Sequence, residues 1–143
     1  GANLVDAAIA RVDSGIRANL HDIRGLGALS GAASTPLDIG ERVSKLGRTT
    51  GLTHGRVTAF DLDNLVVGYD IGALRFDDQI EIEGAGANPF SRGGDSGSIV
   101  VNRRREAVAL LFAGGDSGGT NGMGLTYASP IASVLRALRV TIL

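Results

Sequence analysis

The sequence predicts an all-β barrel or sandwich that ends in a single helix. Short apolar runs recur at intervals of roughly 8–12 residues, which is typical of antiparallel β-domains. Glycine accounts for 22 of the 143 residues, without a collagen-like repeat, and therefore indicates many tight turns. The apolar spacing changes from every second residue to a helical repeat only at Pro130. This length fits one domain.

The composition excludes several classes of function. Fourteen Lys and Arg residues against fifteen Asp and Glu residues give a net charge of −1, so we expect no nucleic-acid partner. The chain has no cysteine, which excludes disulfides and thiolate metal sites, and we expect neither a metal nor a cofactor. No apolar run approaches the roughly 18 residues of a membrane-spanning helix, so we expect no membrane partner.

The first third of the chain gives the weakest structural signal. Residues 1–12 are a short apolar segment interrupted by one carboxylate, Asp6, and their periodicity does not decide between strand and helix. Residues 13–40 are divided by glycines and a proline, which predicts loops with short β-structure around Gly25–Leu29.

Strands are predicted from Arg42 onward. Arg42–Leu46, with Val43 and Leu46 inward, precedes a turn at Gly47–Gly51, and two more strands follow at Arg56–Leu62 and Leu65–Tyr69. Phe76–Glu83 alternates apolar and polar residues, which predicts one half-buried strand; the apolar set is Phe76, Ile80 and Ile82, and the solvent-facing set is Asp77, Gln79, Glu81 and Glu83.

The last third predicts a hairpin, a strand and a helix. Ser98–Val101 and Ala107–Ala113 flank a charged turn, and Leu125–Ala128 is a further short strand. Pro130–Leu138 begins with a proline, as helices often do, and its apolar residues recur at helical spacing.

The pentapeptide Gly-Gly-Asp-Ser-Gly occurs twice, at Gly93–Gly97 and Gly114–Gly118. Either copy is compatible with an ordinary turn. The first copy runs directly into an apolar strand, a setting that holds a serine nucleophile rigidly while the amides of Gly94 and Ser96 stabilise an oxyanion. The second copy continues into more glycine-rich loop, so we interpret Ser117 as a surface residue.

Three segments resemble chymotrypsin-like serine peptidases of the bacterial trypsin-like and alpha-lytic types. Phe90–Val100, FSRGGDSGSIV, resembles their nucleophile region. Val43–Val57, VSKLGRTTGLTHGRV, is similar to a strand-turn-strand of these enzymes, and Asn3–Ala10, NLVDAAIA, resembles the segment with their acidic triad member. The resemblance implies an antiparallel Greek-key barrel, the second of two barrels in such peptidases.

The resemblance also implies roles for individual residues. Ser96 is the expected nucleophile, and Asp6 is expected to orient the catalytic histidine, although a turn or helix-start carboxylate is the alternative for Asp6. Asp95 is expected to be structural, pairing with a polar or charged group nearby. The oxyanion hole is expected at Gly94 and Ser96.

Substrate is expected to bind along the strand end at Ala113 and Gly114, by pairing with the peptide backbone. Phe90 falls where the family places the base of the primary specificity pocket, or is simply a core residue. An apolar residue there indicates no preference for lysine or arginine.

The catalytic histidine is missing from the expected position. His21 and His54 both follow Asp6, and neither matches the family's histidine motif. We therefore expect residues 1–13 to be the last piece of an incomplete first barrel, 14–40 a connector with the first strands of the second, and 41–143 the second barrel with its helix. The histidine is expected on an upstream segment, or self-association covers the incomplete barrel.

The sequence thus predicts a serine endopeptidase fragment that acts on peptide or protein substrates through an acyl-enzyme on Ser96. One alternative is a catalytically silent peptide-binding or assembly module that keeps the barrel. Another is that His21 or His54 enters the site in an unusual arrangement.

Overall fold

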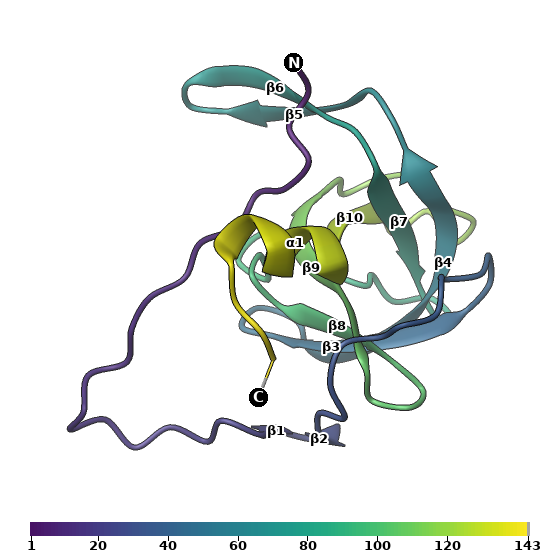
Figure 1. Ribbon diagram of the computed structural model, residues 1–143. Coiled ribbons are helices and arrows are strands. Elements are labelled where there is room, and N and C mark those ends of the chain that lie inside the picture. Colours follow the sequence, from purple (N-terminus) through teal and green to yellow (C-terminus); the bar gives the residue numbers. More distant parts are fainter. Residues whose placement is uncertain (143) are drawn as a thin grey trace.

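Six strands close into an antiparallel barrel in the computed structural model, which describes residues 1–142 (Figure 1). The barrel strands are β3 (Arg42–Gly47), β4 (Gly51–Leu62), β7 (Gln79–Gly84), β8 (Ile99–Asn102), β9 (Ala107–Gly114) and β10 (Leu125–Pro130). Around the barrel they follow the order β10–β7–β4–β3–β8–β9. Because β8 returns to pair with β3 after the run β3–β4–β7, the connection is a Greek key, which confirms the predicted fold.

Helix α1 (Ile131–Leu138) follows β10 without a loop, as predicted from Pro130 and the helical spacing. Ile131 and Val134 are buried, and the helix contacts β9 and β10. It ends at Arg139, whose left-handed conformation allows its amide to bond back to the last turn.

The core lies inside the barrel and is made of aliphatic side chains and one aromatic ring. Alternate residues of each strand point inward, so all six strands contribute. Its buried members are Val43, Val57, Ile80, Ile82, Phe90, Val100, Val108, Ala109, Leu111 and Ala128.

Two small sheets lie outside the barrel. β1 (Asp22–Ile23) pairs with β2 (Gly27–Ala28) near the end of the N-terminal segment, and β5 (Leu65–Tyr69) pairs with β6 (Gly72–Phe76) in a projecting hairpin. The chain start lies against this hairpin, with a bridge between Asn3 and Phe76, and then runs along the outside toward β1 (Figure 1). Its large apolar residues are exposed: Leu4, Ile9, Val12, Ile16 and Leu20.

The single strand predicted over Phe76–Glu83 is wrong. Phe76 ends β6, and β7 begins at Gln79 after a break at Asp78, whose φ of +61° is outside the β region. Gln79 and Glu83 were expected to face solvent but are 0% and 2% exposed. Burial is tolerated because each is hydrogen-bonded: Gln79 to Leu4 and Ser129, and Glu83 to Arg56 and Thr120.

Candidate active site

The first Gly-Gly-Asp-Ser-Gly segment lies between β7 and β8 and is organised around the buried carboxylate of Asp95, which is 1% exposed. Its Oδ1 accepts the amides of Thr49 (2.8 Å) and Thr50 (3.1 Å), and its Oδ2 accepts the Thr50 hydroxyl (2.7 Å) and the Arg92 amide (3.0 Å). Lys45 Nζ lies 3.6 Å from Oδ2 and is also fully buried. Asp95 therefore ties the loop to the β3–β4 turn, as the structural role expected for it requires.

The charge states of this buried pair follow from its neighbours. Burial alone would raise the pKa of Asp95, but hydrogen bonds from the Thr50 hydroxyl and the Arg92, Thr49 and Thr50 amides outweigh it and lower the pKa to about 2. Burial lowers the pKa of Lys45, and the carboxylate of Asp95 opposes that shift. Lys45 also donates to Thr50 Oγ1 (2.5 Å) and to the Gly51 carbonyl (3.0 Å).

Ser96 follows this anchored residue and is exposed. Its Oγ lies 3.3 Å from the carbonyl oxygen of Phe112 in β9, to which it donates. The backbone on its far side is fixed as well, because the Gly97 amide donates to the Leu111 carbonyl at 2.8 Å. Ser96 thus belongs to an exposed turn whose backbone is held on both sides.

The backbone N–H groups of Gly94 and Ser96, on either side of Asp95, point away from the hydrogen bonds that anchor this loop. The Gly93 carbonyl accepts the Thr49 hydroxyl at 2.8 Å, and in a trans peptide the following N–H, that of Gly94, points the opposite way. The Asp95 carbonyl accepts the Ser98 amide and hydroxyl, so the Ser96 N–H also points away from those donors. Within residues 1–142, neither of the two amides donates a hydrogen bond to the protein.

Gly94 has a conformation that favours glycine. Its φ is +99°, and a Cβ at this position would lie 2.4 Å from Thr49 Oγ1. The residue type therefore permits both the turn and the Thr49 hydrogen bond that directs the Gly94 amide.

A small cavity of about 70 Å³ adjoins Ser96. The end of β9 forms one wall through Ala113 and Gly114, the two residues predicted to bind substrate. Arg92 also lines the cavity, and its guanidinium Nη1 donates to the Met123 carbonyl (2.7 Å) and lies 3.9 Å from Asp116 Oδ1. Asp116 itself belongs to the second Gly-Gly-Asp-Ser-Gly segment, whose Ser117 is exposed.

Phe90 does not line this cavity. Its side chain is 1% exposed within the barrel core, and the ring lies 5.8 Å from Lys45 Nζ. Thr53 donates to the Phe90 carbonyl at 2.7 Å, which fixes the chain before the serine loop. The structure thus gives Phe90 the core position that the sequence left as its alternative.

Asp6 lies against the β5–β6 hairpin, where Tyr69 Oη donates to its Oδ2 at 2.6 Å. Burial and the Asp6 carboxylate raise the pKa of Tyr69, which therefore remains a protonated donor at neutral pH. Packed rings lead from there toward the serine: Tyr69 contacts Phe76, and Phe76 contacts Phe112, whose carbonyl accepts Ser96.

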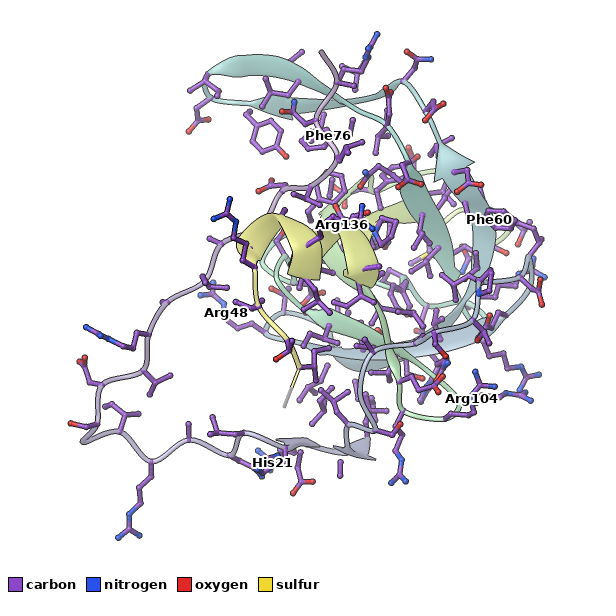
Figure 2. All side chains as sticks on the ribbon, in the orientation of Figure 1. His21, Arg48, Phe60, Phe76, Arg104 and Arg136 are labelled. Atoms are coloured by element: carbon purple, nitrogen blue, oxygen red, sulfur yellow. The ribbon has the colours of Figure 1, made fainter. Side chains whose placement is uncertain are left out.

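Neither histidine is hydrogen-bonded to Ser96. His54 lies on the outer face of β4 and its Nδ1 is 2.7 Å from Ser44 Oγ. Figure 2 shows His21 on the N-terminal segment beside β1, outside the barrel. Among residues 1–142, the only hydrogen bond of the Ser96 side chain is the one to Phe112.

No helix among the described residues is long and apolar enough to cross a membrane. The same residues contain no group of three or more histidine, aspartate or glutamate side chains placed to hold a metal ion.

The sequence did not reveal the supporting residues Lys45 and Thr49. The signal for Lys45 was present, because strand alternation from Val43 places residue 45, not residue 46, on the inward face. The prediction of Leu46 as an inward residue is therefore wrong, and a lysine occupies that interior position because Asp95 compensates its charge.

The fold is that of the chymotrypsin-like serine proteases. The chain matches a chymotrypsin from Cellulomonas bogoriensis with a TM-score of 0.66 and 25% identity, over 93% of this chain and 66% of the protease. It matches a glutamic-acid-specific serine protease with a TM-score of 0.63 and 24% identity, over 92% of this chain and 64% of that protease. It also matches protease A of Thermobifida fusca with a TM-score of 0.61 and 22% identity, over 89% of this chain and 62% of that protease. The chain thus spans less than two thirds of the length of each of these proteases.

The chain belongs to the family of the Nal1 C-terminal domain, whose family model matches residues 9–128. No curated protein matches the sequence.

Proposed function

We propose that this chain is the nucleophile-bearing part of a serine endopeptidase, in which Ser96 forms the acyl-enzyme. The observation that supports this most strongly is the anchored turn at Ser96: the residue is exposed, and within residues 1–142 neither the Gly94 amide nor the Ser96 amide donates a hydrogen bond. In acyl transfer, the serine oxygen attacks the peptide carbonyl, and the negative charge that develops on the carbonyl oxygen needs donors of this kind. Gly94 and Ser96 are the proposed oxyanion hole.

The general base of this reaction is proposed to be a histidine other than His21 and His54. Ser96 needs a histidine to accept its proton, and neither His21 nor His54 contacts it. We propose that an upstream segment brings a histidine to Ser96. Asp6 keeps one carboxylate oxygen, Oδ1, free of the Tyr69 hydrogen bond and is the proposed residue that orients this histidine.

Peptide substrates are proposed to pair with the end of β9. Ala113 and Gly114 form a wall of the cavity beside Ser96, so an extended peptide along this strand places one side chain in that cavity. The apolar side chains of Leu4 and Ile9 in the N-terminal segment are 52% and 62% exposed. Exposed apolar residues of this kind support the proposal that a partner segment packs against them.

A second candidate function is a peptide-binding or assembly module without catalysis. The observation in its favour is the absence of a histidine contact at Ser96 among residues 1–142. Such a module keeps the strand end at Ala113 and Gly114 as its peptide site and does not need Ser96.

Cleavage of an unstructured peptide library distinguishes the two. The chain is tested alone and with the segment encoded upstream of it, in wild-type form and as Ser96→Ala. The proposal expects cleavage only when wild-type chain and upstream segment are combined. Cleavage that persists in Ser96→Ala, or peptide binding without any cleavage by the combination, contradicts the proposal and favours the module.

A further inference from the structure

A large cavity lies away from Ser96, over the outer face of β3 and β4. Its volume is about 710 Å³, within the range of about 300–1,000 Å³ that is typical of small-molecule sites. None of its lining residues lines the cavity beside Ser96. Nothing in the proposed peptidase chemistry uses it.

Basic side chains gather in this cavity. Arg42 lies directly opposite Arg56 in the β3–β4 register, and Ser44 lies opposite His54 on the same outward face. Arg103, from the turn between β8 and β9, lines the same cavity. Directly opposite like charges on paired strands are destabilising, so the Arg42–Arg56 pair requires compensation.

Among residues 1–142, only Arg56 of the three arginines has an ion-paired or hydrogen-bonded side-chain partner. Arg56 Nε donates to Glu83 at 2.7 Å, and the Thr120 amide and hydroxyl bond the same carboxylate. The Thr120 amide, opposed by burial, and Arg56 keep the pKa of Glu83 below its usual value, so this carboxylate is ionised and already satisfied. Arg42 and Arg103 form no ion pair within residues 1–142.

Part of the cavity wall is held by hydrogen bonds within the protein. Asn121 lines the cavity, and its side-chain amide donates to the carbonyls of Gly84, Gly86 and Asn88 at 2.9–3.2 Å. Because these bonds join two loops, a ligand does not have to order them, which reduces the entropic cost of binding.

We propose that this cavity binds a small molecule that carries a phosphate group. Two uncompensated guanidinium groups match the charge of a phosphate monoester, about −1.5 to −2 at pH 7, better than the single charge of a carboxylate. Guanidinium groups also fit phosphate oxygens with paired hydrogen bonds. The cavity is larger than a phosphate ion, which leaves room for the organic part of the ligand.

The test is calorimetric titration of the full chain with inorganic phosphate and with phenyl phosphate, at constant ionic strength, with acetate as the carboxylate control. The double variant Arg42→Gln/Arg103→Gln is compared with Arg17→Gln, an exposed arginine of the N-terminal segment that does not line the cavity. We expect saturable binding of phenyl phosphate, a loss of about tenfold or more in the double variant, and no change in Arg17→Gln.

Three results would overturn the proposal. These are no saturable binding of either phosphate compound, equal affinity for acetate and phosphate, or an equal loss in the double variant and in Arg17→Gln. Circular dichroism spectra and melting temperatures of all variants establish that a lost affinity does not reflect unfolding. Ser96→Ala should bind phenyl phosphate as the wild type does, because Ser96 lies outside the cavity.

Discussion

The buried ammonium of Lys45 on β3 lies 3.6 Å from the carboxylate of Asp95, the residue immediately before Ser96. Thr50 connects the two more closely, because its Oγ1 accepts from Lys45 and donates to Asp95. The conformation of the serine turn is therefore coupled to the barrel wall through charged groups that water does not reach.

Replacing Asp95 by Asn should destabilise the fold by about 3–5 kcal/mol at pH 7, because Lys45 then remains buried without a counter-charge. The folded pKa of Asp95, about 2, lies below its ordinary value. The stabilisation is therefore complete above about pH 4 and is lost as the pH falls through 2.

Urea unfolding of wild type and Asp95→Asn between pH 7 and pH 2 measures this difference. It should be large at neutral pH and should shrink below about pH 4. Asp116→Asn is the control, since that side chain is 90% exposed and should change stability by less than about 0.5 kcal/mol. A difference between wild type and Asp95→Asn that is constant with pH would contradict the assignment of an ionised Asp95.

Gly55 should not tolerate a side chain. A Cβ there would lie 2.3 Å from the Glu83 carbonyl and 2.6 Å from the Phe90 ring, so Gly55→Ala should destabilise the barrel by about 1–3 kcal/mol. Gly68→Ala, in the β5–β6 hairpin, is the matched control because nothing lies within 4 Å of its Cβ. Thermal melting should separate the two variants, and equal melting temperatures would show that β4 and β7 are less closely packed there.

Arg92 should favour an acidic substrate side chain if Ser96 acts as proposed. Its guanidinium lines the cavity beside Ser96, and its nearest carboxylate, Asp116, is 3.9 Å away and largely exposed. Arg92→Gln should lower kcat/KM about tenfold for a peptide with an acidic residue at the cleaved position. A matched peptide with alanine there should be cleaved as before, whereas an equal loss for both peptides would indicate a general disturbance of the loop.

The N-terminal apolar residues should become buried when the proposed upstream segment binds. Leu4 and Ile9 are more than half exposed, and burying each should contribute about 1 kcal/mol or more. The melting temperature of Ser96→Ala should therefore rise by several degrees in the presence of the segment, although this variant cannot cleave. Leu4→Ser/Ile9→Ser should abolish the rise, and an unchanged melting temperature of Ser96→Ala would argue against the partner.

Features set by local sequence could be predicted, whereas features set by tertiary pairing could not. The helix after Pro130 and the serine turn at Gly94 depend on backbone preferences that adjacent residues reveal. The burial of Glu83 depends on Arg56 and Thr120, 27 and 37 residues away, and the burial of Lys45 depends on Asp95. Alternation alone assigned Glu83 to solvent because a single strand does not show which polar groups receive partners.

The candidate site shows the same division. A five-residue motif and its following strand were enough to propose Ser96 and Gly94, but they gave no signal for the cavity wall at Arg92 or for the Thr49 hydroxyl that directs the Gly94 amide. These residues act through contacts between loops that are distant in the sequence. The histidine expected on an upstream segment stays a prediction, since the only hydrogen bond of the Ser96 side chain among residues 1–142 is the one to Phe112.

The central claim is that Ser96 becomes a nucleophile when a histidine is supplied. It is tested most directly by reaction with a fluorophosphonate probe, followed by mass-spectrometric location of the adduct. The account predicts an adduct on Ser96 in wild type and in Ser117→Ala when the upstream segment is present, and almost none in the chain alone. An adduct on Ser117, or no adduct on Ser96 in the combination, would contradict it.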